Sequence, residues 1–315
     1  MSILPKISPN VVDSLEPRRM LAATLSTDGV LAVTGTANND VIVITADPAN
    51  PARLKVSDRG VVTRFTLAAV RLITVEAFRG NDRIQIGETL PIPTSINGAG
   101  GVDSLTGGAG KDTLNGGEAD DLIDGRANND LLIGGIGSDE IIGGPGKDTV
   151  SYEYVTVTFP GSGRAENGAI VSLDGLKNDQ EAGVIEFVDP TVENIIGSQF
   201  RDDLIGNGGA NVISGGGGGD FIVGHGGDDS LIGGKGADTL RGGSGNDTLD
   251  GGDGADQLLG ESGIDVLLGG SANDTLEGGA GIDQITGGGG ADTFLTTERD
   301  AGEVLDFTDG VDLLA

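Results

Sequence analysis

Residues 233–295 read GGKGADTLR GGSGNDTLD GGDGADQLL GESGIDVLL GGSANDTLE GGAGIDQIT GGGGADTFL, which is one nine-residue unit repeated seven times. Units of this kind fill residues 98–151, six in a row, and residues 197–295, eleven in a row. Every unit opens on Gly, and its eighth position is always apolar. The sixth position is Asp in sixteen of the seventeen units, and Asn211 is the exception. A period this strict is typical of an architecture in which each unit contacts mainly its neighbours.

Each unit divides into a turn and a strand. The first six residues, GGxGxD, favour a turn because Gly permits positive φ and Asp bonds back to the backbone. The last three residues place one apolar side chain inward, which predicts a three-residue β-strand. Two units then form one coil, with odd and even units in separate parallel sheets. The predicted fold is all-β, a right-handed parallel β-roll or β-helix solenoid of nonapeptide repeats with a thin apolar core.

The regular aspartates indicate sites for a hard cation, because carboxylates in Gly-rich turns offer only oxygen ligands. The chain has no Cys and one His, which favours calcium over zinc. Calcium also suits flexible, carbonyl-rich turns better than magnesium does. The net charge is −30, with 49 acidic residues against 19 basic ones. Because stacked coils would bring like carboxylates together around a small core, we expect calcium to drive folding and the calcium-free chain to be largely disordered.

The unit GGxGxDxUx, in which U is apolar, resembles the RTX or hemolysin-type calcium-binding repeat, and the match covers about half of the chain. The resemblance implies a β-roll with several calcium ions between the turns of units i and i+2, held by backbone carbonyls and by pairs of position-six aspartates 18 residues apart. Carried over to this sequence, the metal ligands are Asp103, Asp112, Asp121, Asp130, Asp139, Asp148, Asp202, Asp220, Asp229, Asp238, Asp247, Asp256, Asp265, Asp274, Asp283 and Asp292.

Several units depart from the family pattern. The second block is the more regular one from residue 215 to residue 295, so we expect this part to be the stronger calcium binder. The sites around Asn128, Phe200 and Asn211 depart most. The fourth Gly is replaced by Ala119, Asn128, Phe200 and Ala272, and the second Gly by Arg126, His225 and Glu261.

The rest of the chain divides around the two repeat blocks, residues 97–151 and 197–295. Residues 28–96 are predicted as an irregular β-helix lead-in, in which Asp40 and Asp82 occupy sixth positions of degenerate units. A plain turn is at least as good an interpretation of these two aspartates as a metal site. Residues 152–196 are predicted as a β insert that keeps the solenoid continuous, with a hinge between two rolls as the alternative. Residues 296–315 form a C-terminal cap, and residues 1–27 form a sorting or tail segment.

Residues 15–21 read LEPRRML, which resembles the LEPR-xLL motif near the start of large bacterial surface and secreted proteins, with Met20 in place of Leu. An ordinary basic tail is the alternative. The N-terminus has no apolar run long enough for a secretory signal or a membrane span. The family resemblance implies type I export to the cell surface or the medium, so the expected partners are calcium ions, the secretion machinery and a cell-surface partner. The acidic charge disfavours nucleic acid.

The sequence contains neither an HExxH zinc motif nor a GxSxG nucleophile elbow. Its one histidine, His225, stands in a repeat turn, so no catalytic residue and no cofactor other than calcium is predicted. The expected function is that of a calcium-binding structural or adhesion-type protein. Two alternatives remain: the repeat module of a secreted toxin or hydrolase, and a polysaccharide-modifying β-helix enzyme. Carboxylates available to such an enzyme are Asp58, Glu76, Glu166, Asp174, Asp179 and Glu186.

Overall fold

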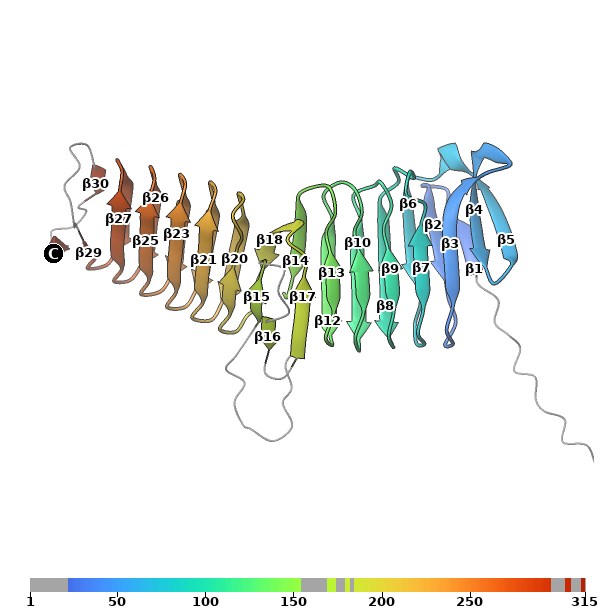
Figure 1. The fold of residues 1–315 in the computed structure, drawn as a ribbon, viewed down its shortest axis with the longest axis horizontal. Coiled ribbons are helices and arrows are strands. Elements are labelled where there is room, and N and C mark those ends of the chain that lie inside the picture. Colours follow the sequence, from blue (N-terminus) through green and yellow to red (C-terminus); the bar gives the residue numbers. More distant parts are fainter. Residues whose placement is uncertain are drawn as a thin grey trace, which may run out of the picture.

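The computed structural model describes residues 22–153, 169–173, 179–181, 184–295, 304–306 and 313–314. They form a long solenoid whose strands succeed one another along a single axis (Figure 1). In the described part, the only helix is the short 3-10 helix η1 (Leu67–Ala69). The prediction of an all-β parallel solenoid is confirmed. The LEPR-xLL-like stretch lies outside the described residues.

One sheet, here called the long sheet, runs through both repeat blocks. Its strands in spatial order are β1 (Ala22–Leu25), β2 (Val30–Thr34), β6 (Leu72–Glu76), β8 (Thr94–Gly100), β10 (Thr113–Glu118), β12 (Leu131–Ile136), β14 (Asp148–Ser151), β18 (Val192–Ile196), β20 (Val212–Gly217), β22 (Ser230–Lys235), β24 (Thr248–Asp253), β26 (Val266–Ser271), β28 (Gln284–Gly289) and β30 (Val304–Asp306). All pair in parallel except β1 with β2. Because β14 pairs with β18 and β18 with β20, this sheet stays continuous across the insert.

Two shorter sheets share the other side of the solenoid. The N-terminal sheet contains β5 (Val61–Thr66), β4 (Asn50–Asp58), β3 (Val41–Asp47), β7 (Arg83–Ile86), β9 (Ser104–Thr106), β11 (Leu122–Asp124), β13 (Glu140–Ile142), β17 (Val184–Val188) and β16 (Asp179–Glu181). The C-terminal sheet contains β15 (Ile170–Ser172), β19 (Asp203–Ile205), β21 (Phe221–Gly226), β23 (Thr239–Ser244), β25 (Gln257–Ser262), β27 (Thr275–Ala280), β29 (Thr293–Phe294) and β31 (Leu313–Leu314). The insert therefore interrupts one side of the roll only.

The coil has the predicted period. Partners in neighbouring parallel strands are 18 residues apart, as in Leu231 with Leu249 on the long sheet and Leu240 with Leu258 on the C-terminal sheet. Odd and even units therefore alternate between the two sides, as expected. The position-eight side chains of all seventeen units are no more than 1% exposed and lie in one core with the lead-in.

Strands β20 to β28 of the second block are longer than the predicted three residues. They extend through the first three residues of the next unit, as in β24, where Gly252 continues the register by pairing with both Gly234 and Gly270. Backbone N–H and C=O groups of stacked turns can pair without any side chain, and for that reason the glycines join the ladder. The three-residue prediction holds for β9, β11, β13 and β19.

The lead-in has a different internal structure from the repeats. Strands β3, β4 and β5 are antiparallel, whereas β2, β6, β8 and β3, β7, β9 stack in parallel toward the first repeats. Five lead-in strands each bury two large apolar side chains, where a repeat strand buries one. These are Leu31 and Val33, Ile42 and Ile44, Leu54 and Val56, Ile73 and Val75, and Ile84 and Ile86.

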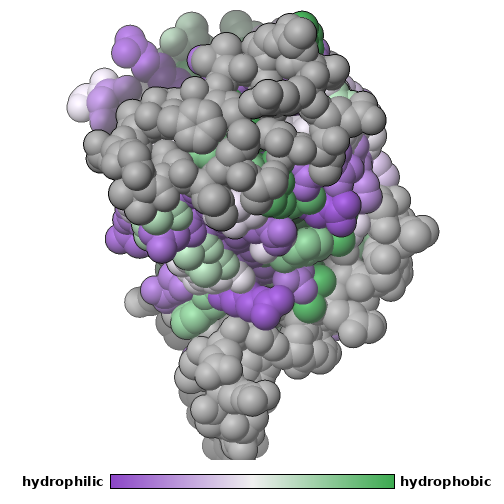
Figure 2. All heavy atoms as spheres, turned by 90° about the vertical axis from the view of Figure 1, so that its left-hand side faces the viewer, coloured by the Kyte–Doolittle hydropathy of each residue, from purple (hydrophilic) through white to green (hydrophobic). Residues whose placement is uncertain are grey.

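At the other end, β30 pairs with β28 and β31 with β29, so described strands continue both sheets beyond the last repeat. Viewed from this end, hydrophilic and hydrophobic side chains are interspersed on the visible coloured surface (Figure 2). In the described residues, no helix is long and apolar enough to cross a membrane.

Candidate metal centre

The sixteen predicted ligands lie inside the roll. Each position-six aspartate is no more than 3% exposed, and so is Asn211 in the exceptional unit. The side chain folds back beneath its own turn, toward the Gly that opens the unit. A Cβ built on that Gly would lie within 3.0 Å of the carboxylate Oδ2 in each of these sixteen units, for example between Gly233 and Asp238. In these units the first position therefore has no room for a side chain beside the buried carboxylate as it is placed.

One oxygen of each carboxylate belongs to a ladder along the axis. Asp121 Oδ1 accepts a hydrogen bond from the Asp103 N–H at 2.7 Å, and Asp247 Oδ1 accepts one from the Asp229 N–H at 2.9 Å. The same bond links successive position-six residues within both blocks, always from the earlier N–H to the later carboxylate. The predicted pairs are thus neighbours in space, joined through one backbone N–H group.

The second oxygen has no such partner in most turns. The following Oδ2 atoms are buried and accept no hydrogen bond from the described residues: those of Asp82, Asp103, Asp121, Asp130, Asp139, Asp148, Asp220, Asp229, Asp238, Asp247, Asp256, Asp265 and Asp274. A buried polar atom without a partner costs about 1–3 kcal/mol, and more if it is charged. Native proteins rarely leave such groups unsatisfied, so a row of them indicates a ligand.

Four turns are closed by the protein itself, and we call them closed turns. In each, the N–H of position two donates to the side chain of position six: Thr36 to Asp40 at 2.6 Å, Gly108 to Asp112 at 2.7 Å, Ser198 to Asp202 at 2.6 Å, and Asn207 to Asn211 at 2.9 Å. Each closed turn is the first of its stack. In closed turns, position-six oxygens are satisfied without a metal ion.

The other repeat turns share a different backbone, and we call them open turns. Their position two adopts a left-handed φ, as at Gly234 (109°) and Gly252 (97°). This conformation accompanies every unpaired Oδ2 noted above. Side chains replace the second Gly of open turns at Ala99, Arg126, His225 and Glu261, with φ of 73°, 78°, 75° and 73°. A left-handed residue with a side chain is strained and persists only where the surroundings demand it.

The pKa values of the ladder aspartates also favour a bound cation. Burial raises the pKa of Asp121 and of Asp130 to about 8, and neighbouring carboxylates add to the rise. Burial also raises the pKa of Asp220 and of Asp229 to about 7. Both causes disfavour the ionised form, and a bound cation would remove the second and compensate the first.

The residues therefore fit calcium. In the described part, no three Asp, Glu or His side chains converge on one point, so carboxylates alone cannot form a site. Each turn contributes one carboxylate, and the carbonyl of the first Gly two units later lies nearby: a Cβ on Gly233 would meet both Asp238 Oδ2 and the Gly251 oxygen. Carboxylate and carbonyl oxygens together are the ligand set that calcium prefers.

Two carboxylates that accept N–H bonds of the ladders were not among the predicted ligands. Asp82 lies one coil before Asp103 and is 2% exposed. Glu193 bridges the insert: its Oε2 accepts the Asp148 N–H at 2.7 Å, and its carbonyl accepts Asn211 Nδ2 at 2.7 Å. Glu193 stands 18 residues before Asn211, so extending the period of the second block backwards would have identified it.

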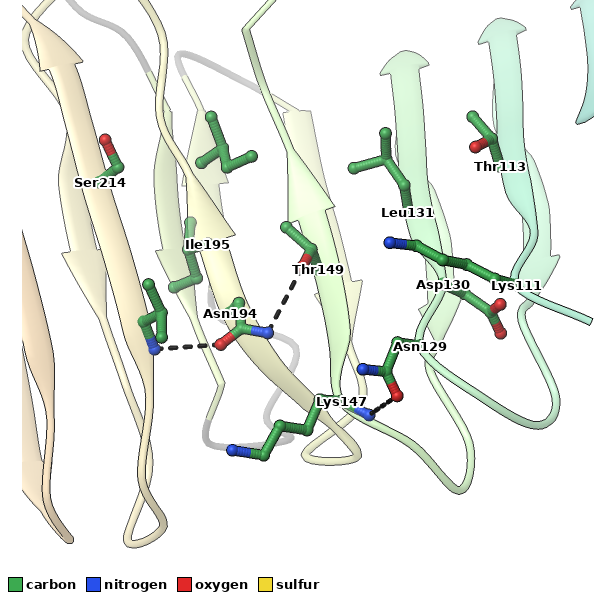
Figure 3. Close-up of a pocket in the computed structure, with 12 residues that line it drawn as sticks. Lys111, Thr113, Asn129, Asp130, Leu131, Lys147, Thr149, Asn194, Ile195 and Ser214 are labelled. Carbon is green, nitrogen blue, oxygen red and sulfur yellow. Dashed lines mark hydrogen bonds between the residues drawn. The ribbon is translucent and has the colours of Figure 1, made fainter.

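A groove of about 630 Å³ lies on the long sheet where the first block meets the insert (Figure 3). Lys111 and Lys147 line it, together with Thr149 and Asn194, whose side chains are hydrogen-bonded at 3.4 Å. Its one carboxylate is Asp130, a member of the aspartate ladder. The groove therefore contains no acid–base pair apart from the ladder.

A family model of the RTX calcium-binding nonapeptide repeat (4 copies) matches residues 97–132, 124–152, 196–231, 232–267 and 268–296. These segments span both repeat blocks and cover about half of the chain. The lead-in, with Asp40 and Asp82, lies outside them. A search of the curated proteins returns no match.

Proposed function

Because its two blocks are RTX calcium-binding nonapeptide repeats, this chain binds calcium at multiple repeats, and we propose that calcium held in its open turns drives the folding of the roll. The observation that carries this proposal is the row of buried Oδ2 atoms without hydrogen-bond partners. The position-six aspartates of open turns supply the carboxylate, and backbone carbonyls of stacked turns supply the remaining protein ligands. The ion neutralises the ladder and satisfies its free oxygens.

The proposal gives closed turns a lesser role. Asp112 and Asp202 already accept two N–H bonds each, one from their own turn and one from the preceding strand or ladder residue. We therefore expect their substitution to affect calcium binding less than substitution of Asp130 or Asp220, which stand one coil later in the same stacks.

We also propose that the protein works outside the cell, as a secreted or surface-bound structural or adhesion-type protein. The support is the use of calcium as a folding ligand, since millimolar calcium is typical of extracellular fluids and weak sites of about 10⁻⁴–10⁻³ M are typical of extracellular modules. Export through a type I system would keep the chain unfolded until it meets calcium. A partner on the cell surface belongs to the same proposal.

A polysaccharide-modifying enzyme has less support. Glycoside chemistry needs two carboxyl groups flanking one bond. Asp58 lies on β4 and Glu76 on β6, in different sheets, and each is engaged: Asp58 accepts the Val41 N–H at 3.2 Å and Glu76 accepts Asn97 Nδ2 at 2.9 Å. Asp179 and Glu186 are backbone partners in the β16–β17 hairpin. Glu166 and Asp174 lie outside the described residues.

Circular dichroism during a calcium titration tests the proposal. In excess chelator the far-UV spectrum should show mainly disorder, and calcium should produce β-structure cooperatively, with several ions bound per chain by equilibrium dialysis. Magnesium at the same concentration is the control and should produce little change. A full β-spectrum in chelator that calcium does not alter would contradict calcium-driven folding.

A further inference from the structure

A repeat-like turn lies outside the matched segments, at residues 77–82, which read AFRGND. It stacks directly beneath the first repeat turn, residues 98–103. The Asp82 N–H donates to Asp103 Oδ1 at 2.7 Å, the same bond that joins successive turns within the blocks. The Gly80 N–H donates to the Gly100 carbonyl at 2.9 Å. The stack of repeat turns thus continues into the lead-in by one more coil.

This turn is open by the criteria of the repeats. Asp82 is 2% exposed, its Oδ1 accepts the Asp40 N–H at 2.6 Å, and its Oδ2 is buried without a hydrogen-bond partner among the described residues. Position two, Phe78, has φ 76°, and position four, Gly80, has φ 131°. The turn below it, which ends at Asp40, is closed by Thr36.

The left-handed φ of Phe78 indicates that the surrounding structure holds this turn in the open form. A bulky residue in the left-handed region is a backbone outlier, and its side chain is 48% exposed, so packing does not account for it. A closed turn would avoid the strain, as it does at Thr36, and would satisfy the Asp82 carboxylate. The chain instead keeps the strained turn and the free oxygen, a combination that, among the residues the structure describes, is otherwise confined to the repeat turns.

We propose that the calcium array extends into the lead-in, with a calcium ion bound at the Asp82 carboxylate within the stack of turns 35–40, 77–82 and 98–103. This inference rests on the proposed function, since it assigns calcium to an open turn. The ion would stabilise the contact between the lead-in and the first coil of the repeats. Ala77 stands where the repeats have Gly, and we expect its additional methyl group to make this site weaker than the repeat sites.

The number of calcium ions bound by the full chain tests the inference, by equilibrium dialysis at saturating calcium. Asp82→Asn removes the charged ligand and should lose one ion per chain. Phe78→Thr should lose the same ion without touching the carboxylate, because a hydroxyl residue at position two accompanies the closed turns at Thr36 and Ser198. It also removes the strained side chain, so it keeps the test decisive if Asp82→Asn folds poorly.

Two matched controls should retain the wild-type number of ions. Phe78→Gly keeps the open turn, and Glu88→Gln removes one exposed carboxylate of the lead-in that is not part of any ladder. If Asp82→Asn and Phe78→Thr both bind as many ions as the wild type, the inference is overturned while the proposed function stands. A wild-type chain that binds no calcium would overturn the proposed function instead.

Discussion

The lead-in and the second repeat block form similar coils, but they differ in charge and in the number of apolar side chains that each strand buries. Residues 22–96 carry seven acidic and seven basic residues, and their β2, β3, β4, β6 and β7 strands each bury two large apolar side chains. Residues 197–295 carry sixteen acidic and three basic residues, and each repeat strand buries one large apolar side chain. Hydrophobic burial can hold the first region together. The second must neutralise a buried row of carboxylates, and we infer that calcium does so.

The largest expected effect concerns the single apolar residue of a repeat strand. Leu249→Asp places a charge in a core that has no second apolar residue in the same strand. We expect a loss of several kcal/mol, because a buried unpaired charge is costly, and no folding of the second block at any calcium concentration. Calcium-titrated circular dichroism measures it. Thr248→Asp, on an exposed neighbouring position, is the control, and equal behaviour of the two variants would contradict the one-residue core.

Removing one ligand should have the next largest effect. Asp247→Ala takes away an open-turn carboxylate and the acceptor of the Asp229 N–H bond. We expect at least one calcium ion fewer per chain and a calcium midpoint roughly tenfold higher, as for a charged hydrogen bond worth about 1.5–3 kcal/mol. Calorimetric titration gives both values. Asp253→Ala removes an exposed carboxylate from the same coil and should change neither; an unchanged stoichiometry in Asp247→Ala would show that the ladder does not bind calcium.

Acid should partly replace calcium in the repeats. Burial raises the pKa of Asp121, Asp130, Asp220 and Asp229 in the calcium-free fold to about 7–8, above the ordinary 3.8. The folded state therefore binds more protons than the unfolded state, and its stability falls as pH rises from about 4 to about 8. In chelator, β-structure should be greater at pH 5 than at pH 8. Equal or smaller β-content at pH 5 would contradict the buried position of the aspartates.

The smallest effect should come from relieving strain in a single turn. Ala272 stands at position four with φ 83°, where most units of the second block have Gly. Ala272→Gly should stabilise the calcium-bound roll by roughly 0.5–1 kcal/mol, because the left-handed penalty exceeds the entropy that Gly adds to the unfolded chain. Chemical denaturation in calcium measures the gain. Ala280→Gly is the matched control, since Ala280 has no left-handed φ, and it should give no gain.

The period of the sequence predicted the solenoid, the alternation of units between two sides and the identity of the core residues. It also placed the aspartates of each stack next to one another. It did not predict how the turns differ, because Gly108 and Gly117 are both the second Gly of a unit, yet Gly108 belongs to a closed turn and Gly117, with φ 115°, to an open one. The closed turns among the described residues are each the first of their stack, so the difference follows the position of a turn in the assembled roll and cannot be read from one unit.

Irregular segments limited the prediction in a second way. Asp82 follows AFRGN in place of GGxGx, so its geometry could not be separated from that of a plain turn before the backbone conformation of Phe78 was known. Glu193 was not identified from the sequence for a similar reason, because the segment before Asn211 keeps the 18-residue period but lacks the repeat glycines. In both cases the stacking, and not the local composition, positions the carboxylate.

Hydrogen exchange measured by mass spectrometry, in excess chelator and in saturating calcium, tests the central comparison most directly. We predict that in chelator the amides of β3, β4 and β6 remain protected while those of β22 to β28 exchange at the rate of an unfolded chain, and that calcium protects both regions. Protection of β22 to β28 in chelator, equal to that in calcium, would contradict the claim that the repeats depend on calcium.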